Sequence, residues 1–203
     1  MKGTRCRVVI GLLGQAAAVA SPGAFAQEEH KERPYLGGSF GSTKLNGACD
    51  DARSAFAMFG GTVASCDDKS TGWKIFGGVQ INKHFAIEGT YINWGELKGS
   101  GTLIGVPVSI SGDATSFGVA AVGILPISER FSLFGKAGVL MTTVSATIAG
   151  GGVSASDDDD DTELHLGVGA MFHLTDRWSI RGEWERTQDS KIEMISIGIQ
   201  YRF

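Results

Sequence analysis

The chain has 203 residues, of which 30 are glycine, and a formal net charge of −4 at pH 7. An acidic chain lacks the basic surface that nucleic acids and anionic membrane surfaces attract, which argues against both partners. Its length is typical of one domain. Beyond residue 26 no apolar run is long enough for a transmembrane helix, so a membrane location would require a closed β-barrel.

Residues 1–26 are predicted to be a cleavable signal peptide. They begin with a short basic region, continue as an apolar run over Val8–Ala20 and end in an A-x-A cleavage motif at Ala24–Ala26. The apolar run is shorter than the roughly 18 to 20 residues that a transmembrane helix needs. The chain would therefore be exported, and residues 27–203 are expected to form one barrel domain.

Eight segments are predicted to be β-strands, because apolar residues tend to recur at every second position along them. Each has about ten residues, the length of a tilted transmembrane strand. The segments are Tyr35–Lys44, Gly72–Ile81, Phe85–Trp94, Ser116–Leu125, Phe131–Thr143, Glu163–Leu174, Trp178–Arg186 and Ile192–Phe203.

The connections between these segments alternate between short and long. Short turns are expected at residues 80–84, 126–130 and 175–177, and long polar connections at 45–71, 95–115 and 146–162. Bacterial outer-membrane barrels have an even number of antiparallel strands, short periplasmic turns and long extracellular loops. The sequence therefore predicts an all-β fold, an eight-stranded antiparallel up-and-down transmembrane β-barrel.

Charged residues of the predicted strands collect on one face. That face must be the lumen, because an Arg or Lys facing lipid at mid-membrane costs about 2 to 4 kcal/mol. Three acids and three bases are expected there as an ion-pair network that closes the barrel: Glu88, Lys136, Arg181, Glu183, Glu185 and Arg202. The alternative is a narrow ion-conducting pore whose selectivity these side chains set.

Two further features lie in the long connections. Cys49 and Cys66 are expected to form a disulfide, since the chain is exported and further Cys or His ligands for a metal are lacking nearby. Asp157–Asp161 is expected to be a solvated acidic loop tip rather than a discrete cation site, so neither a metal nor a cofactor is predicted.

Apolar residues between 103 and 110 leave two interpretations open. They would either extend the strands beyond the membrane or form an exposed apolar patch for a host or lipid partner. Extended strands are the favoured interpretation. The residues concerned are Leu103, Ile104, Val106, Val108 and Ile110.

Three short stretches resemble the membrane domain of the OmpA-type outer-membrane family. They are FGGVQIN at Phe76–Asn82, GILPIS at Gly123–Ser128 and SIGIQYRF at Ser196–Phe203. The resemblance covers Tyr35–Phe203 and implies an eight-stranded up-and-down barrel, which is expected to be a monomer in the bacterial outer membrane. The chain stops at the barrel, so the separate peptidoglycan-binding domain of full-length members is expected to be missing, and a role as a cell-wall tether is not expected.

The resemblance further suggests functional residues. In the family a charged cluster closes or gates the lumen, and Glu88 and Arg181 match one of its acid and base pairs. A second pair would align with Val122 and Met171, which removes both charges together. The alternating residues Ile199, Tyr201 and Phe203 resemble the C-terminal signal read by the outer-membrane assembly machinery.

Together these features predict a protein that contributes to envelope integrity and surface interaction. Its expected partners are outer-membrane lipid and lipopolysaccharide, the assembly machinery, and a surface ligand at the long loops. An enzyme that modifies lipid A would need a Ser and a His together at the lipid-facing edge. The histidines do not fit, since His30 precedes the strands, His84 lies in a turn, and His165 and His173 face the lumen. An enzyme is therefore not expected.

Overall fold

The computed structural model describes residues 33–150 and 153–203. The predicted signal peptide and His30 lie outside the described residues. Nine strands and one helix are described, in chain order: β1 (Arg33–Leu45), α1 (Ala48–Met58), β2 (Thr62–Cys66), β3 (Lys69–Gln80), β4 (Phe85–Leu103), β5 (Val106–Pro126), β6 (Phe131–Gly150), β7 (Val153–His173), β8 (Trp178–Thr187) and β9 (Ile192–Arg202).

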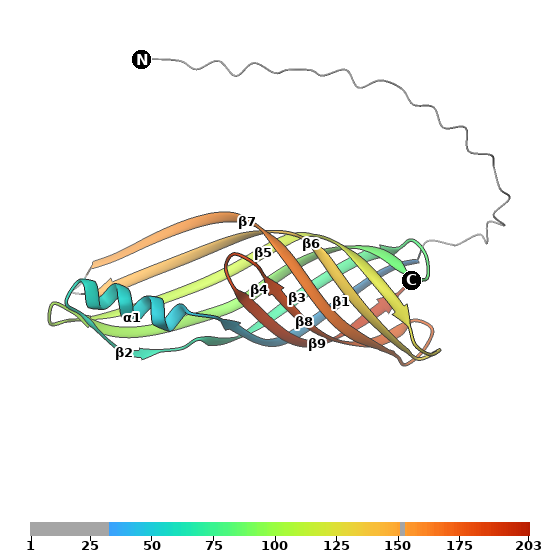
Figure 1. Cartoon of the computed structure of the whole chain (residues 1–203), viewed down its shortest axis with the longest axis horizontal. Coiled ribbons are helices and arrows are strands. Elements are labelled where there is room, and N and C mark those ends of the chain that lie inside the picture. The colour runs from blue at the N-terminus through green and yellow to red at the C-terminus, as the bar shows by residue number, and fades with distance from the viewer. Residues whose placement is uncertain (1–32, 151–152) are drawn as a thin grey trace, which may run out of the picture.

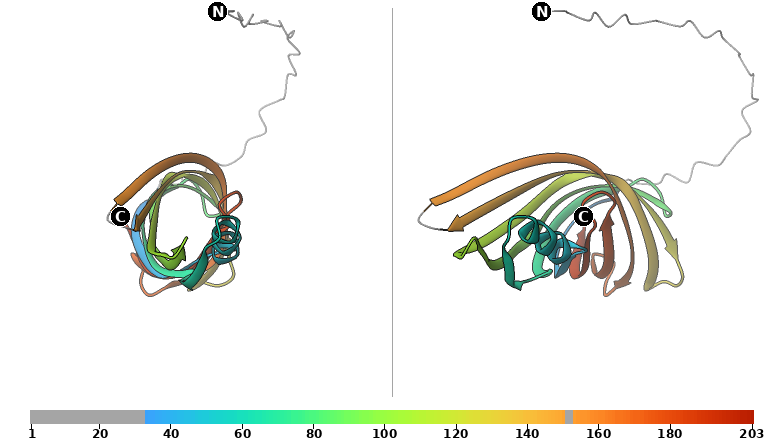
Figure 2. Two further views of the ribbon diagram at one scale, coloured as in Figure 1. Left: turned by 90° about the vertical axis from the view of Figure 1, so that its left-hand side faces the viewer. Right: turned by 60° about the vertical axis from the view of Figure 1, so that its left-hand side comes forward.

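Eight of these strands close into an antiparallel barrel. From β3 to β9 each strand pairs with the next along the chain, and β1 joins the two ends by pairing with both β3 and β9. The short β2 pairs with β4 beyond the reach of β3. The ring is seen end-on in Figure 2, and the predicted eight-stranded up-and-down barrel is confirmed.

The outer surface of the barrel is an apolar belt. Leu36 and Phe40 on β1 are exposed, as are Ile195, Ile197 and Ile199 on β9. Such a continuous exposed apolar surface is far larger than soluble monomers present to water. It fits a hydrocarbon environment. No helix in the described part of the chain has the length and apolar character needed to cross a membrane.

The strands project further at one end of the barrel than at the other, as Figure 1 shows. We call this the extended end; it comprises residues 45–71, 95–115, 143–150, 153–162 and 188–191. The opposite end, here the turn end, contains the short connections at 81–84, 127–130 and 174–177. The two termini of the barrel meet at the turn end, where the Phe203 N–H donates to the Pro34 carbonyl at 3.0 Å.

Two of the three long connections are strand extensions rather than loops. β4 and β5 continue to a tight turn at Ile104 and Gly105, and β6 and β7 remain paired out to Gly150 and Val153. The segment around Leu103–Ile110 is thus β-hairpin, which agrees with the favoured interpretation of its apolar residues. Cross-strand pairing gives these backbone groups the hydrogen bonds that a loop would have to obtain from water.

Asp157–Asp161 lies within β7 rather than at a loop tip, which corrects the expectation from sequence. Its backbone pairs with residues 142–146 of β6, and Thr143 Oγ1 donates to Asp160 at 2.6 Å. Aspartate is rare in strands, so its low propensity favoured a loop, but pairing with the β-branched residues of β6 overrides that preference. β8 pairs with β7 only from His165, which leaves residues 153–163 as an edge, and acidic residues there oppose pairing with another chain.

The first long connection contains α1 and β2, neither of which was predicted. Cys49 on α1 and Cys66 on β2 are bonded to each other, and this disulfide ties the helix to the sheet. Ala48, Ala52 and Phe56 lie four residues apart on α1 and line a cavity together with β4 and β5. Residues at this spacing share one helix face, so α1 packs that face against the extended end.

Gly138 is required where the backbone of β5 approaches β6 closely. A Cβ at Gly138 would clash with the Val119 carbonyl oxygen and the Ala120 Cα atom, whereas one at Gly135 would lie 3.8 Å from its nearest neighbour. We expect Gly138→Ala to lower the free energy of unfolding by about 1 to 3 kcal/mol, as overpacking does. Gly135→Ala on the outer face of the same strand should change it by less than about 0.5 kcal/mol.

Urea unfolding of the refolded variants, followed by tryptophan fluorescence, measures both changes. Equal unfolding midpoints for Gly138→Ala and Gly135→Ala would show that the two strands can separate at Gly138 without cost.

Candidate functional site

The barrel lumen contains a charged layer between two apolar layers. The first apolar layer, toward the turn end, is formed by Tyr35, Phe76, Ala86, Val122, Phe134 and Met171. The second, toward the extended end, is formed by Ile92, Trp94, Leu140, Ile192 and Met194. The charged layer consists of Lys74, Glu88, Lys136, His165, Arg181, Glu183 and Glu185, none more than 5% exposed.

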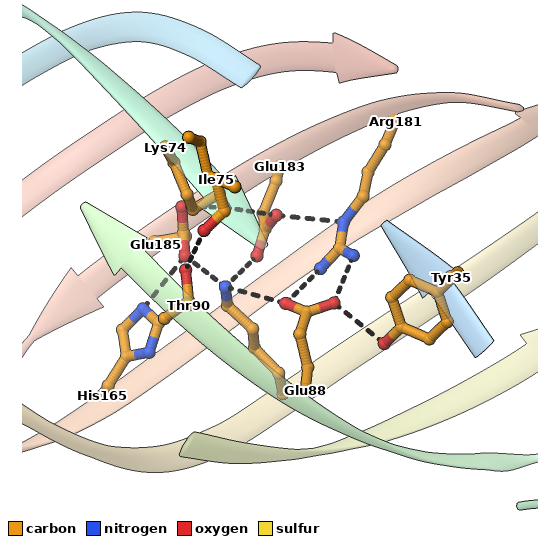
Figure 3. Close-up of polar contacts among 10 residues, drawn as sticks. Tyr35, Lys74, Ile75, Glu88, Thr90, His165, Arg181, Glu183 and Glu185 are labelled. Atoms are coloured by element: carbon orange, nitrogen blue, oxygen red, sulfur yellow. Dashed lines mark hydrogen bonds and ion pairs between the residues drawn. The ribbon is translucent and has the colours of Figure 1, made fainter. Parts of the chain in front are cut away.

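These charged side chains converge because their strands alternate inward and outward. Arg181, Glu183 and Glu185 occupy every second position of β8, so all three point into the lumen. Facing strands supply the partners: Lys74 from β3, Glu88 from β4, Lys136 from β6 and His165 from β7. Figure 3 shows these contacts as one connected cluster.

Arg181 and Glu88 form the pair nearest the turn end. Two nitrogens of the Arg181 guanidinium donate to the two carboxylate oxygens of Glu88 at 2.6 and 3.1 Å, and the Tyr35 hydroxyl donates to Glu88 at 3.0 Å. The guanidinium carbon lies 4.4 Å from the ring centroid of Phe76 and 4.2 Å from that of Phe134. A bidentate pair whose guanidinium also contacts two aromatic rings is held in one geometry.

Lys74 and Lys136 connect the two remaining acids. Lys74 Nζ lies 2.7 Å from Glu183 Oε2 and also contacts Glu185. Lys136 Nζ lies 2.5 Å from Glu183 Oε1, contacts Glu185, and lies 3.7 Å from Glu88 Oε1. Each lysine therefore bridges at least two carboxylates, which joins the cluster to the Arg181–Glu88 pair.

His165 extends the cluster toward the second apolar layer. Its Nε2 lies 3.0 Å from Glu185 Oε1, and its side chain is fully buried. Without His165 the cluster holds three acids and three bases, so its formal charge balances when the histidine is neutral. A balanced cluster avoids the cost of an uncompensated buried charge.

The sequence placed Arg202 in this network, but the structure places it elsewhere. Arg202 pairs in register with Tyr35, whereas Arg181 pairs with Gly198, four residues nearer the extended end on β9. At about 3.3 Å per residue, these four residues span roughly 13 Å along β9. Arg202 instead lines a pocket at the turn end with Arg33, Asp176, Arg177 and Phe203. Alternation identifies the face of a residue but not its depth in the barrel.

Three members of the site were absent from the predicted network: Lys74, Tyr35 and His165, the last of which was expected only to face the lumen. Lys74 lies on the lumen face of β3, and alternation with Trp73 and Ile75 would have found it. Tyr35 was identified only as the start of a strand; a tyrosine facing inward beside Glu88 has no local sequence signal. Their contacts with the predicted residues depend on which strands are neighbours in the closed barrel.

Val122 and Met171, which align with a second charged pair of the OmpA-type family, belong to the first apolar layer. Val122 is the register partner of Lys136, and Met171 is the register partner of Arg181. Both are buried, so apolar contact replaces the second pair without leaving a lone charge there.

Glu163 is a further buried acid, and hydrogen bonds satisfy it. It accepts from Thr142 Oγ1 at 2.7 Å and from the Ser190 N–H and hydroxyl at 3.0 and 2.8 Å. This series of hydrogen bonds continues from Thr142 Oγ1 to Ser116 Oγ, which lie 2.7 Å apart. Trp94 Nε1 in turn donates to Ser116 Oγ at 2.7 Å. These contacts fix the short β8–β9 turn over the second apolar layer.

His173 lies at the turn end beside two serines. Its Nδ1 lies 2.7 Å from Ser179 Oγ and its Nε2 lies 3.2 Å from Ser132 Oγ. A Ser–His–acid triad needs a carboxylate on one ring nitrogen to orient the histidine. Here hydroxyls occupy both, on the lumen side rather than the lipid side of the barrel.

A family comparison extends these observations to known proteins. The sequence model of the family described as "Outer membrane protein beta-barrel domain" matches residues 11–203. The chain matches no curated protein.

Solved structures share the fold. OprG from Pseudomonas aeruginosa aligns with a TM-score of 0.59 and 11% identity, over 86% of this chain and 97% of that one. Ail of Yersinia pestis gives a TM-score of 0.54 and 20% identity, over 86% and 99%. The N-terminal barrel of Pseudomonas aeruginosa OprF gives 0.51 and 9%, over 84% and 97%. At these identities the likeness concerns the fold alone.

Proposed function

The chain belongs to the outer membrane protein beta-barrel domain family and lies in the bacterial outer membrane, and we propose that it is a non-enzymatic barrel with a closed lumen. Its role is to support the envelope and to present the extended end to the exterior. In this proposal residues 1–26 direct export and are removed, leaving residues 27–203 as the barrel domain.

The charged layer carries the proposal. Six charged side chains and His165 fill the lumen, and all seven are buried. Eight strands enclose an interior that side chains nearly fill. The two lysines each bridge carboxylates from β8, and Arg181 contacts two aromatic rings. This filling leaves ions no wide path, which supports a structural plug over a pore.

The extended end supports the surface role. Ail has been solved in complex with sucrose octasulfate, a heparin analogue. In the present chain the extended end is rich in acids, with Asp50, Asp51, Asp67, Asp68 and Asp157–Asp161. Like charges repel across an interface. We therefore expect a surface ligand of this chain to be neutral or cationic rather than polyanionic.

Assembly is the remaining part of the proposal. The C-terminal residues Ile199, Tyr201 and Phe203 would be read by the outer-membrane assembly machinery before the barrel closes. Ile199 and Phe203 are exposed, and the ring of Tyr201 packs edge-on against Trp178 and Phe203. Lipid and lipopolysaccharide would then surround the belt.

Planar-bilayer conductance tests the closed lumen. Refolded residues 27–203, with folding checked by the shift in gel mobility on heating, should give no discrete current steps. The double variant Glu88→Ser, Arg181→Ser removes one balanced pair and its volume. It should conduct in small discrete steps, because the lost volume opens the lumen. The barrel should still fold, because the remaining two acids and two lysines still pair.

The matched control is Arg202→Ser, which removes a base outside the charged layer and should stay silent. A porin added afterwards to the same bilayer verifies that single channels can be recorded. Steady steps from the unmodified protein, with an ion selectivity that changes on Glu88→Ala, would instead establish a narrow pore.

A further inference from the structure

An apolar groove lies at the extended end, above the second apolar layer. A cavity of about 260 Å³ opens there. Its lining is dominated by apolar side chains and glycine, with Thr43, Asp113 and Ser190 contributing the remainder. The apolar side chains are Leu45, Trp94, Leu97, Ala114, Val144 and Ile192.

This cavity continues beneath α1. A second cavity, of about 160 Å³, is lined by Ala52 and Phe56 of α1 and by β2, β4 and β5. Leu97 and Gly112 line both cavities, so the two spaces adjoin along the inner wall of β4 and β5. The result is an elongated groove rather than a compact chamber.

Small residues create the room for this groove. Gly112 and Ala114 occupy consecutive inward positions of β5, directly above Ser116 of the hydrogen-bonded chain to Glu163. Apolar residues of ordinary size at these two positions would fill the space. An apolar cavity of 150 Å³ binds benzene in a protein interior, so the larger space here can hold a longer molecule.

The groove is closed at its inner end. Trp94 forms its floor, with the indole N–H bonded to Ser116, and the buried Leu140 and Met194 lie in the same apolar layer. Beneath that layer lies the charged layer, which an apolar molecule cannot cross without displacing paired charges. The disulfide between Cys49 and Cys66 holds α1 as the roof. The geometry is that of a binding site, not of a passage.

We propose that this groove binds a single linear alkyl chain. The elongated shape suits an extended chain better than a ring system, and the lining offers few polar groups for a charged ligand. This alkyl chain could belong to a free alkyl molecule that arrives from outside, or it could be an acyl chain of a membrane lipid. The chemistry of recognition is the same for both sources, and the test below separates them.

Contact quenching of Trp94 tests the proposal. The other three tryptophans, Trp73, Trp178 and Trp184, lie on the outer face and are replaced by Phe, so that Trp94 alone fluoresces. The protein is placed in lipid nanodiscs and titrated with bromooctane, whose bromine quenches a tryptophan that it touches. Quenching should saturate, and Ala114→Phe should raise the half-saturating concentration about tenfold by filling the groove.

The matched control is Ala121→Phe, the same substitution on the exposed outer face of β5. It should leave the titration unchanged. If Ala114→Phe lacks the heat-dependent gel shift of a folded barrel, Val144→Phe narrows the same cavity from β6. A second arm uses nanodiscs of phosphatidylcholine brominated on its acyl chains, without bromooctane.

Strong quenching by the brominated lipid that Ala114→Phe abolishes would support the proposal and identify the lipid as the source of the chain. Saturable quenching by bromooctane alone would support the proposal with a free alkyl molecule as the source of the chain. A linear, unsaturable response that is equal in Ala114→Phe and Ala121→Phe would overturn the proposal. So would saturable quenching by bromonaphthalene with none by bromooctane, since the site would then prefer rings.

Discussion

Replacing Arg181 with Met is expected to lower the free energy of unfolding by about 3 to 5 kcal/mol, the usual cost of removing one partner of a buried ion pair. Glu88 would keep its charge but lose both guanidinium hydrogen bonds, leaving the Tyr35 hydroxyl and the more distant Lys136. Urea unfolding in phospholipid vesicles, followed by tryptophan fluorescence, measures the loss.

The double variant Arg181→Met, Glu88→Gln separates charge from volume. It leaves two lysines facing two carboxylates, so the lumen is balanced again, and most of the lost stability should return. Replacement of a whole buried pair is often close to neutral, whereas removal of one member is not.

Arg202→Met is the matched control for the same change of residue type. Arg202 lies at the turn end, and no ion pair to it is found within residues 33–150 and 153–203. Its replacement should change the free energy of unfolding by less than about 0.5 kcal/mol. If Arg181→Met cost no more than Arg202→Met, the charged layer would not be what stabilises the barrel.

Replacing Phe203 with Ala is expected to deplete the folded protein from the outer-membrane fraction of cells while barely affecting the refolded barrel. The ring of Phe203 is 70% exposed and meets Tyr201 edge-on, so its removal should cost no more than about 1 kcal/mol in stability. The two readouts are the amount of heat-shifted protein in isolated membranes and urea unfolding in vesicles.

Ile195→Ala provides the comparison, since Ile195 is an apolar residue of β9 with a similar exposure of 67%. It should leave the amount in the membrane nearly unchanged. Equal depletion by Phe203→Ala and Ile195→Ala would mean that general apolar content, and not a terminal signal, governs assembly.

The main features of the barrel could be read from the sequence because a strand has a period of two. Alternation in the eight segments separated the lipid face from the lumen, and it placed Glu88, Lys136, Arg181, Glu183 and Glu185 on the inside. The short turns followed from the spacing of the segments. These properties are local, since each depends on residues within about ten positions of one another.

Other features depended on which segments are neighbours. Asp157–Asp161 has a low strand propensity, yet it extends β7 because β6 supplies the hydrogen bonds. The helix α1 has no long apolar repeat, and its position follows from Cys66 and from the sheet beneath it. Propensity could not reveal contacts made between distant parts of the chain.

Single residues of the lumen also divide into properties that local sequence predicts and properties that depend on neighbouring strands. The sequence by itself determined which face each strand side chain takes, and hence that charges must meet inside. Only the closed barrel decided the depth at which they meet, because the stagger between strands sets the level of each residue. That stagger brings Lys74 to Glu183, keeps Arg202 at the turn end, and leaves an apolar groove whose wall includes Leu97 and Gly112.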